Sequence, residues 1–535
     1  MRITLTLTTA LIASQPAFAT LFEDIPVGNA YATSMGNAVT ASPPGVYSIH
    51  FNPAGLAKIK QKTTAIGGSL INLKADAYFY DHDPRFQAFI EEHGMVDEAE
   101  NTHSKNNNYA FYGPGMKLQK LDIPAMPLPT AGWAWPIKDT SVTFATAIYV
   151  PTGAGYSRDD DDSGRFMGRR VAIARINYLS PTIGVQLNDR WSVGGGIAVA
   201  WQGLGIDMDF RAPNIGLALV DSIQTQSCPT TGNPSPVAFS PFATLIGLCG
   251  SELGPFTHVA NVKLEVNDTH SINANIGVLY EPSDWFSWGA VYRAQANNNM
   301  SGPFTLTYTD AWFNFFKGLN PTIVSALARL GVAMPGPHRS ETGTASVSLP
   351  QPATFSTGIK LKVVPRLQFN FDLKWADYEK WETFTVDFHQ NLDFLKLASL
   401  AESKHATKTK LIIPRYYKSV WNWGMGFEYE YSNQLKLRAG YEDRNSSVPR
   451  DRQDLFLPVG NGTLISLGFG YKLDDSQNLD FAIAQSKLVA RVPAGSSYNS
   501  NYMGADNFVY NPYAGLNYKT VTTINLLEMG YQKTF

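Results

Sequence analysis

The sequence has few cysteines, few charged residues and no long apolar run. Only Cys228 and Cys249 occur in 535 residues, which excludes a disulfide-dense miniprotein. Charged residues are 16% of the chain, below the roughly 25% of globular proteins. The net charge of -2 offers no basic excess to nucleic acid, so we expect no nucleic-acid partner. After the N-terminal 19 residues, no segment approaches the roughly 18 apolar residues of a membrane helix.

The N-terminus has the pattern of a secretory signal peptide. Arg2 supplies the positive region, Leu5 to Ala13 an apolar stretch, and Ala17-Phe18-Ala19 a cleavage site. The pattern predicts a signal peptide over residues 1–19, and a buried first helix is the weaker alternative. An exported chain can still reside in a membrane, since a β-barrel carries its apolar signal in every second residue.

Apolar and polar residues alternate over long stretches. Between Ala353 and Trp375 one phase is mostly apolar and the other carries Lys360, Lys362 and Asp372. The same period returns over residues 179–201 and 421–441. These runs reach ten or more residues with Trp or Tyr near their ends, whereas strands of soluble sandwiches are usually about five or six residues long. The pattern therefore favours a membrane barrel over a soluble sandwich.

The connections alternate between short and long. Short turns are predicted near residues 136–140, 188–190, 281–284, 364–366, 432–434 and 474–478, and long connections at 76–125, 151–167, 212–256, 310–339, 389–407, 446–460 and 492–517. This count predicts an all-β, 14-stranded antiparallel transmembrane barrel over residues 62–535, with short turns on the periplasmic side. The final strand ends on Phe535, as outer-membrane barrels often do.

Residues 20–61 lack a strand pattern and are rich in Gly and Pro. This segment is too short for an independent domain and would gain stability by packing inside something larger. A barrel of fourteen strands encloses a lumen that side chains alone do not fill. We therefore predict an N-terminal plug, or hatch, with a periplasmic tail as the alternative.

Several segments resemble one family. They are Asn52, Pro53, Ala54 and Gly55 of NPAGLA, with LSPTIGVQLNDRWSVGGGIAVAW, WGAVYRAQ, LPQPATFSTGI and LRAGYEDRNSSVP. Together they resemble the outer-membrane long-chain fatty-acid transporters (FadL/OMPP1/TodX-like), although PVGNGTLISLG stands where a more acidic segment is usual. The resemblance implies the outer membrane of a Gram-negative bacterium. It also implies passive uptake of hydrophobic compounds by loop capture, an inner apolar site and a hatch-gated lateral exit.

Long-chain fatty acids are the leading substrate, with aromatic or aliphatic hydrocarbons as the alternative. Outer-membrane lipid and lipopolysaccharide are the expected surroundings, and we expect a monomer. Inward cations such as Arg175, Lys360, Lys362 and Arg438 are candidates to pair a carboxylate, although such charges more often form ladders with each other.

The connection at 310–339 is unusually apolar for a wet loop and begins a helix at Asn320-Pro321. The resemblance implies capture helices in this loop and the preceding one, so the candidate ligand-lining residues are Trp312, Phe313, Phe316, Leu319 and Ile323. Helices that only pack on each other are the alternative.

The resemblance also implies that Phe22 lies near an inner ligand site. It implies separately that the third strand is kinked. Pro151, Gly153 and Gly155 are candidates for that kink, and ordinary entry into a loop is the alternative. Whether Cys228 and Cys249 form a disulfide is not readable from the sequence.

Enzyme motifs are lacking. No HExxH, paired metal spacing, G-x-S-x-G elbow or phosphate-binding loop occurs, so we expect no catalytic residue, no metal and no cofactor. The alternative from another class is an outer-membrane barrel lipid hydrolase, because catalytic triads are spatial rather than sequential.

Overall fold

The computed structural model describes residues 27–92, 95–228, 245–332, 334–401, 403–504 and 511–535. The predicted signal peptide and Phe22 lie outside these residues. Among the helices described, none is long and apolar enough to cross a membrane.

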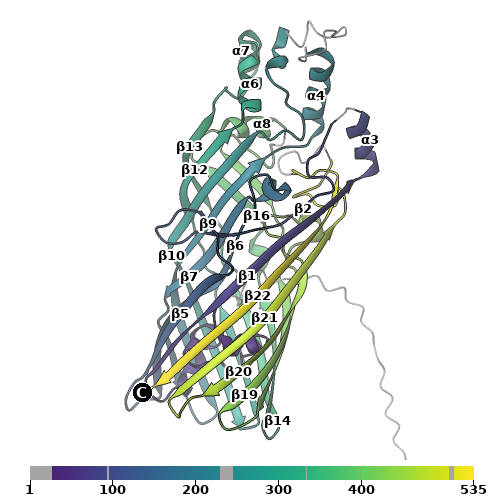
Figure 1. The fold of residues 1–535 in the computed structure, drawn as a ribbon. Helices are drawn as coiled ribbons and strands as arrows, with labels where there is room; N and C mark the ends of the chain where they lie inside the picture. The colour runs from purple at the N-terminus through teal and green to yellow at the C-terminus, as the bar shows by residue number, and fades with distance from the viewer. Residues whose placement is uncertain (1–26, 93–94, 229–244, 333, 402, 505–510) are drawn as a thin grey trace, which may run out of the picture.

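Twenty of the described strands form one closed antiparallel barrel with fourteen spans (Figure 1). β1 pairs with both β5 and β22, which closes the wall. In chain order the spans are β1 (Thr63–His82), β5 (Met126–Pro136), β6 (Val142–Ser157), β7 (Arg170–Leu179) with β8 (Thr182–Gln186), β9 (Trp191–Phe210), β10 (Ala260–Ser283), β11 (Phe286–Arg293) with β12 (Met300–Tyr308), β13 (Ser340–Val347) with β14 (Thr354–Val364), β15 (Leu367–Ala376) with β16 (Thr383–Phe388), β17 (Lys410–Pro414) with β18 (Val420–Glu430), β19 (Leu435–Arg444), β20 (Asn461–Lys472), β21 (Gln477–Val492) and β22 (Leu516–Thr534).

The six short turns and seven long connections fall between these spans as predicted. Two boundaries were wrong, because β1 continues to His82 and β6 continues to Ser157. Outward positions near the end of β1 carry Lys74 and Asp76 instead of apolar residues. The period-two signal therefore disappears there, although backbone pairing with β22 continues to Phe79 and beyond.

The wall has an apolar outer face and a polar inner face. Ile66, Ile276 and Ile465 are 56%, 63% and 60% exposed on the outside. On the opposite phase of β15, Asn370 and Asp372 are fully buried inside the bore. The predicted alternation of a lipid-facing and a bore-facing phase is confirmed.

Short helices occupy the plug and the extracellular loops. The plug contains α1 (Ala30–Ser34), η1 (Gly45–Tyr47), α2 (Ser48–Phe51) and η2 (Pro53–Lys58). The loops and strand breaks contain α3 (Pro84–Glu92), η3 (Ser163–Met167), α4 (Ile215–Ser227), η4 (Leu248–Gly250), α6 (Asp310–Gly318), α7 (Pro321–Arg329), η5 (Tyr378–Lys380), α8 (Asp393–Ala401) and η6 (Arg450–Arg452). A disulfide between Cys228 and Cys249 joins the end of α4 to η4.

A buried ion pair ties two extracellular loops together. Arg211 Nη1 lies 2.6 Å from Asp97 Oδ1, and both side chains are fully buried. Burial disfavours the charged carboxylate, but the charge and hydrogen bonds of Arg211, with the His82 ring 3.3 Å from Asp97 Oδ2, hold the pKa of Asp97 at about 2. Since this lies below the usual value of 3.8, the pair stabilises the loops above about pH 4 and loses that contribution as the pH falls toward 2.

A charge on the lipid-facing phase is expected to destabilise the barrel according to its depth. Leu467 of β20 is 55% exposed between neighbouring apolar strands, whereas Leu473 lies at the periplasmic turn. We expect Leu467→Arg to lower the free energy of unfolding in lipid vesicles by about 2–4 kcal/mol and Leu473→Arg by about 0–1 kcal/mol. Equal losses in reversible urea titrations would contradict the assignment of the outer face.

Candidate transport site

The plug segment, residues 27–58, lies inside the periplasmic half of the barrel (Figure 1). Its backbone is held by polar residues of the bore. Thr40 N donates to Asp372 Oδ2 at 2.8 Å, and Asn370 Nδ2 donates to the carbonyl of Ala38 at 2.6 Å. The polar inner phase of the wall therefore supplies hydrogen-bond partners that a segment with little regular structure would otherwise lack.

Asn52 organises the resembled motif. Its Oδ1 accepts from Ala54 N and begins η2, while its Nδ2 donates to the carbonyls of Thr40 and Val278 at 2.9 and 3.0 Å. The side chain is fully buried. Asn52 thus joins two parts of the plug to strand β10 of the wall.

Glycines in the wall allow this close approach. Gly184, Gly194 and Gly277 lie side by side on β8, β9 and β10. A Cβ at Gly194 would lie 2.3 Å from the carbonyl carbon of Pro53, and one at Gly277 would lie 2.1 Å from Asn52 Oδ1. Any larger side chain at these positions would push the motif away from the wall.

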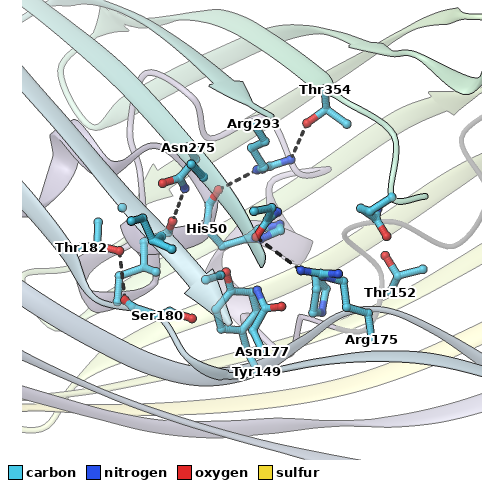
Figure 2. Close-up of a pocket in the computed structure, with 18 of the residues that line it drawn as sticks. His50, Tyr149, Thr152, Arg175, Asn177, Ser180, Thr182, Asn275, Arg293 and Thr354 are labelled. Atoms are coloured by element: carbon cyan, nitrogen blue, oxygen red, sulfur yellow. Dashed lines mark hydrogen bonds between the residues drawn. The ribbon is translucent and has the colours of Figure 1, made fainter. Parts of the chain in front are cut away.

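An inner cavity lies between the plug and β6, β7, β9, β10 and β11 (Figure 2). Its polar lining residues are His50, Tyr149, Thr152, Arg175, Asn177, Ser180, Thr182, Asn273, Asn275, Arg293, Gln351 and Thr354. The plug closes one side, because Asn275 Nδ2 donates to Ile49 O and Arg293 Nε donates to His50 O. The cavity therefore depends on the position of the plug.

Arg175 brings a positive charge to this cavity. Its guanidinium contacts Gln202 Oε1, Ser271 Oγ and Ser271 O at 3.1, 2.7 and 3.4 Å, all of them neutral groups. Among the described residues no carboxylate forms an ion pair with it, although it is only 2% exposed. Its Nε and the hydroxyl of Thr152 make no hydrogen bond to the protein. The cavity thus combines a buried cation with unused polar groups.

The other candidate cations are paired with carboxylates or lie outside the cavity. Arg438 contacts Glu428 and Asp480 at 2.7 and 2.6 Å, and Lys360 lies 3.9 Å from Glu281. Lys362 is exposed near the periplasmic turn. Arg175 is therefore the best placed of the four to meet an anionic ligand.

The wall is open beside this cavity, between β5 and β6. These strands pair only from Pro136↔Thr143 to Ala131↔Ile148, so the rest of each strand lacks the other as a partner. Pro151, Gly153 and Gly155 lie in this part of β6, beside a shift of register with β7 between Tyr149 and Thr152. The candidate kink residues thus belong to the strand and not to a loop.

The apolar candidates of the fourth loop lie on its two helices. Trp312 and Phe316 are 3% and 5% exposed, because Trp312 stacks on Tyr308 and α6 packs on the η4 region. Phe313, Leu319 and Ile323 remain half-buried. The large apolar side chains most exposed around these helices are Leu219, Leu245 and Leu330, at 62%, 61% and 79%.

A family model described as "Outer membrane protein transport protein (OMPP1/FadL/TodX)" matches residues 9–535. The chain belongs to this family. It is 19% identical over 353 residues to the long-chain fatty acid transport protein of Escherichia coli O6:H1 strain CFT073, which covers 66% of this chain and 68% of that protein. The FadL-family assignment establishes a transport channel of the Gram-negative outer membrane for hydrophobic compounds. It is not an enzyme, so the hydrolase alternative falls.

Solved structures of the FadL family share the fold. A Pseudomonas aeruginosa FadL homologue has a TM-score of 0.65 at 17% identity and covers 97% of this chain and 100% of its own. The Pseudomonas putida toluene transporter TodX has a TM-score of 0.57 at 14% identity, covering 97% and 100%. At these identities the likeness establishes the fold and does not choose a substrate.

Sequence reasoning missed His50, Tyr149 and Arg293 as cavity residues. His50 lies two residues before the NPAG motif and Arg293 lies within WGAVYRAQ, so both were near recognised segments. No local pattern marked them, because the plug and two separate strands bring them together only in the folded barrel.

We predict that Asn52→Asp loosens the plug. The aspartate keeps the acceptor that begins η2 but cannot donate to Thr40 and Val278, and the lost hydrogen bonds correspond to about 1–3 kcal/mol. We expect larger conductance in planar bilayers with unchanged heat-modifiable migration on gels. Asn29→Asp is the matched control, since Asn29 begins α1 by accepting from Ala32 N in the same way. Equal conductance in both variants would contradict the role of Asn52.

Proposed function

We propose that this channel takes up long-chain fatty acids by passive diffusion. The observation that carries the proposal is a cavity beside the plug that holds a buried guanidinium and adjoins an apolar opening in the wall. A fatty acid has one anionic end and one apolar end, so this pair of environments suits it. No energy source is indicated.

Capture begins on the extracellular helices. Leu219, Leu245 and Leu330 expose large apolar surfaces there, with Phe313 and Ile323 half-buried nearby. An exposed apolar patch binds the acyl chain before any narrow passage is reached. Trp312 and Phe316 support this surface from below and are not expected to touch the ligand unless α6 moves.

The carboxylate then binds near Arg175. A guanidinium donates two parallel hydrogen bonds to a carboxylate, and the free Nε–H of Arg175 offers one of them. Arg293 and the unpaired hydroxyl of Thr152 lie in the same cavity.

The acyl chain leaves sideways between β5 and β6. Tyr149, Pro151 and Thr152 line the inner cavity, while Val150, Gly153 and Gly155 line the opening. Consecutive residues of one irregular strand therefore connect the two spaces. Movement of the predicted plug, residues 20–61, admits the ligand to this route. Phe22 precedes in sequence the part of the plug that lines the cavity.

An aromatic or aliphatic hydrocarbon is the second candidate. The apolar lining of the wall opening favours it, since such a ligand needs no partner for a charge. The toluene transporters TbuX of Ralstonia pickettii and TodX of Pseudomonas putida have the same fold. The buried charge of Arg175 favours the carboxylate instead.

Uptake by intact cells tests the proposed function directly. Cells with the gene are expected to accumulate labelled oleate faster than cells without it, and labelled toluene serves as the comparison. Unchanged uptake of both compounds would remove the transport role proposed here for fatty acids and for hydrocarbons.

Arg175→Gln separates the two substrates. Loss of a charge-assisted hydrogen bond corresponds to about 1.5–3 kcal/mol, so we expect oleate uptake to fall about tenfold or more, with toluene uptake within about twofold of wild type. Arg175→Lys keeps the charge and should retain part of the oleate uptake. Lys362→Gln is the control outside the cavity. Equal loss for oleate and toluene would make Arg175 a structural residue.

A further inference from the structure

The opening between β5 and β6 is covered from outside by a hairpin of the first extracellular loop. The hairpin consists of β3 (Tyr109–Phe111), a turn, and β4 (Gln119–Leu121). Figure 1 shows this part of the chain as the dark blue loop that crosses the outside of the wall. Backbone groups of the hairpin pair with each other and not with the barrel sheet.

The exposure of outward side chains on β9 shows where the hairpin lies. Ile197 and Trp201 belong to the same outward phase, yet Ile197 is 53% exposed and Trp201 only 3%. The ring of Tyr112 covers Trp201 edge to face, with centroids 5.4 Å apart. The hairpin thus shields a surface that would otherwise meet lipid.

Two further contacts hold the hairpin across the wall. Asn267 Nδ2 donates to the Tyr112 hydroxyl at 3.0 Å, and Leu118 N donates to Glu265 Oε1 at 2.7 Å. A Cβ at Gly155 would lie 2.0 Å from the carbonyl oxygen of Ala110. The outer surface is shaped to receive the hairpin, but only a few polar contacts fasten it.

Tyr109 stands in the opening itself. Its ring is 5% exposed and packs with the apolar cluster inside the barrel, whereas Tyr112 packs on the outside. Its hydroxyl accepts from Asn72 Nδ2 of β1 at 2.7 Å and donates to the carbonyl of Pro124, just before β5, at 3.2 Å. Tyr109 therefore bridges the strand and the chain that border the opening.

The space around Tyr109 is an apolar cavity. Side chains from β1, β5, β6, β7 and β22 line it, and apart from the two tyrosine hydroxyls every lining side chain is apolar. The cavity reaches from inward residues such as Leu128 and Ile524 to the outward Ala174. It thus passes through the thickness of the wall.

We propose that this wall cavity is a binding site for the apolar chain of the substrate, and that the β3–β4 hairpin is its outer gate. The proposal rests on the proposed lateral uptake and adds the site and the element that controls release. The chain occupies the cavity while Tyr109 holds the opening. Displacement of the hairpin then exposes the cavity to the surrounding lipid.

A disulfide lock tests the gate. A Cβ at Gly205 would lie 3.3 Å from Leu118 Cβ, close to the roughly 3.5–4.5 Å of disulfides, so Leu118→Cys with Gly205→Cys is expected to cross-link the hairpin to β9. In proteoliposomes we expect the oxidised double variant to take up oleate at least fivefold more slowly than wild type. Dithiothreitol should restore the rate to within twofold.

The controls separate the gate from the uptake function. Each single cysteine variant, and wild type with its Cys228–Cys249 disulfide, should respond little to dithiothreitol. Wild-type uptake rates in protein shown by mass spectrometry to be cross-linked would overturn the gate and leave the proposed function intact. Absence of uptake by wild type would overturn both.

Tyr109 provides a second, independent measurement. Tyr109→Phe keeps the ring and loses both hydrogen bonds, whereas Tyr109→Ala also empties the opening. We expect oleate uptake to rise in both, more in Tyr109→Ala, with heat-modifiable migration retained.

Occupancy of the cavity is read with a fatty acid carrying a diazirine at its chain end. Adducts on the segments of Leu128, Ala154 or Ala174 that excess oleate removes would support the site. Adducts confined to the extracellular helices or the inner cavity would overturn it.

Discussion

The wall of this barrel depends on one constraint, which is that every backbone amide and carbonyl facing lipid must find a partner within the protein. Along most of the circumference the neighbouring strand provides it. Where β5 and β6 separate, the first loop does so instead. β2 (His103–Ser104) pairs with β1, and Asn108 forms an isolated bridge with Ser157. The side chain of Asn106 takes the place of a neighbouring strand, because its Oδ1 accepts from Ala75 N at 2.6 Å and its Nδ2 donates to the carbonyl of Leu73 at 2.9 Å. The opening can exist because this loop satisfies its borders.

The same constraint explains the plug. A bore lined with Asn370, Asp372 and Glu442 would be wet and wide without it, and the plug would have little structure without the bore. Each supplies hydrogen-bond partners to the other, as in the contact between Asn37 Nδ2 and Glu442 Oε2 at 3.1 Å. Because these contacts are polar and individually modest, many of them together fix the plug, and each costs little free energy to break.

The irregular part of β6 gives the molecule two different chemical environments a few residues apart. A regular strand sends alternate residues to the bore and to lipid. Around Pro151 the register with β7 shifts, and here residues of β6 line both the polar cavity with Arg175 and the apolar cavity in the wall. An amphiphile suits such a border, since its carboxylate and its chain have opposite requirements. A hydrocarbon would use only the apolar side.

Strand number, topology and sidedness were determined by the sequence itself, because alternation, turn length and helix starts such as Asn320-Pro321 are local signals. The NPAG motif likewise marked the family without a structure. Only the tertiary structure decided which residues meet. Trp201 lies in the apolar outward phase, but the hairpin keeps it from lipid, and Trp312 and Phe316 are covered within their own loop helices. Arg175, Arg293 and His50 come from two strands and the plug, so their cavity exists only after the barrel closes around the segment that fills it. Contacts between residues far apart in the sequence produce no periodic pattern from which they could be predicted.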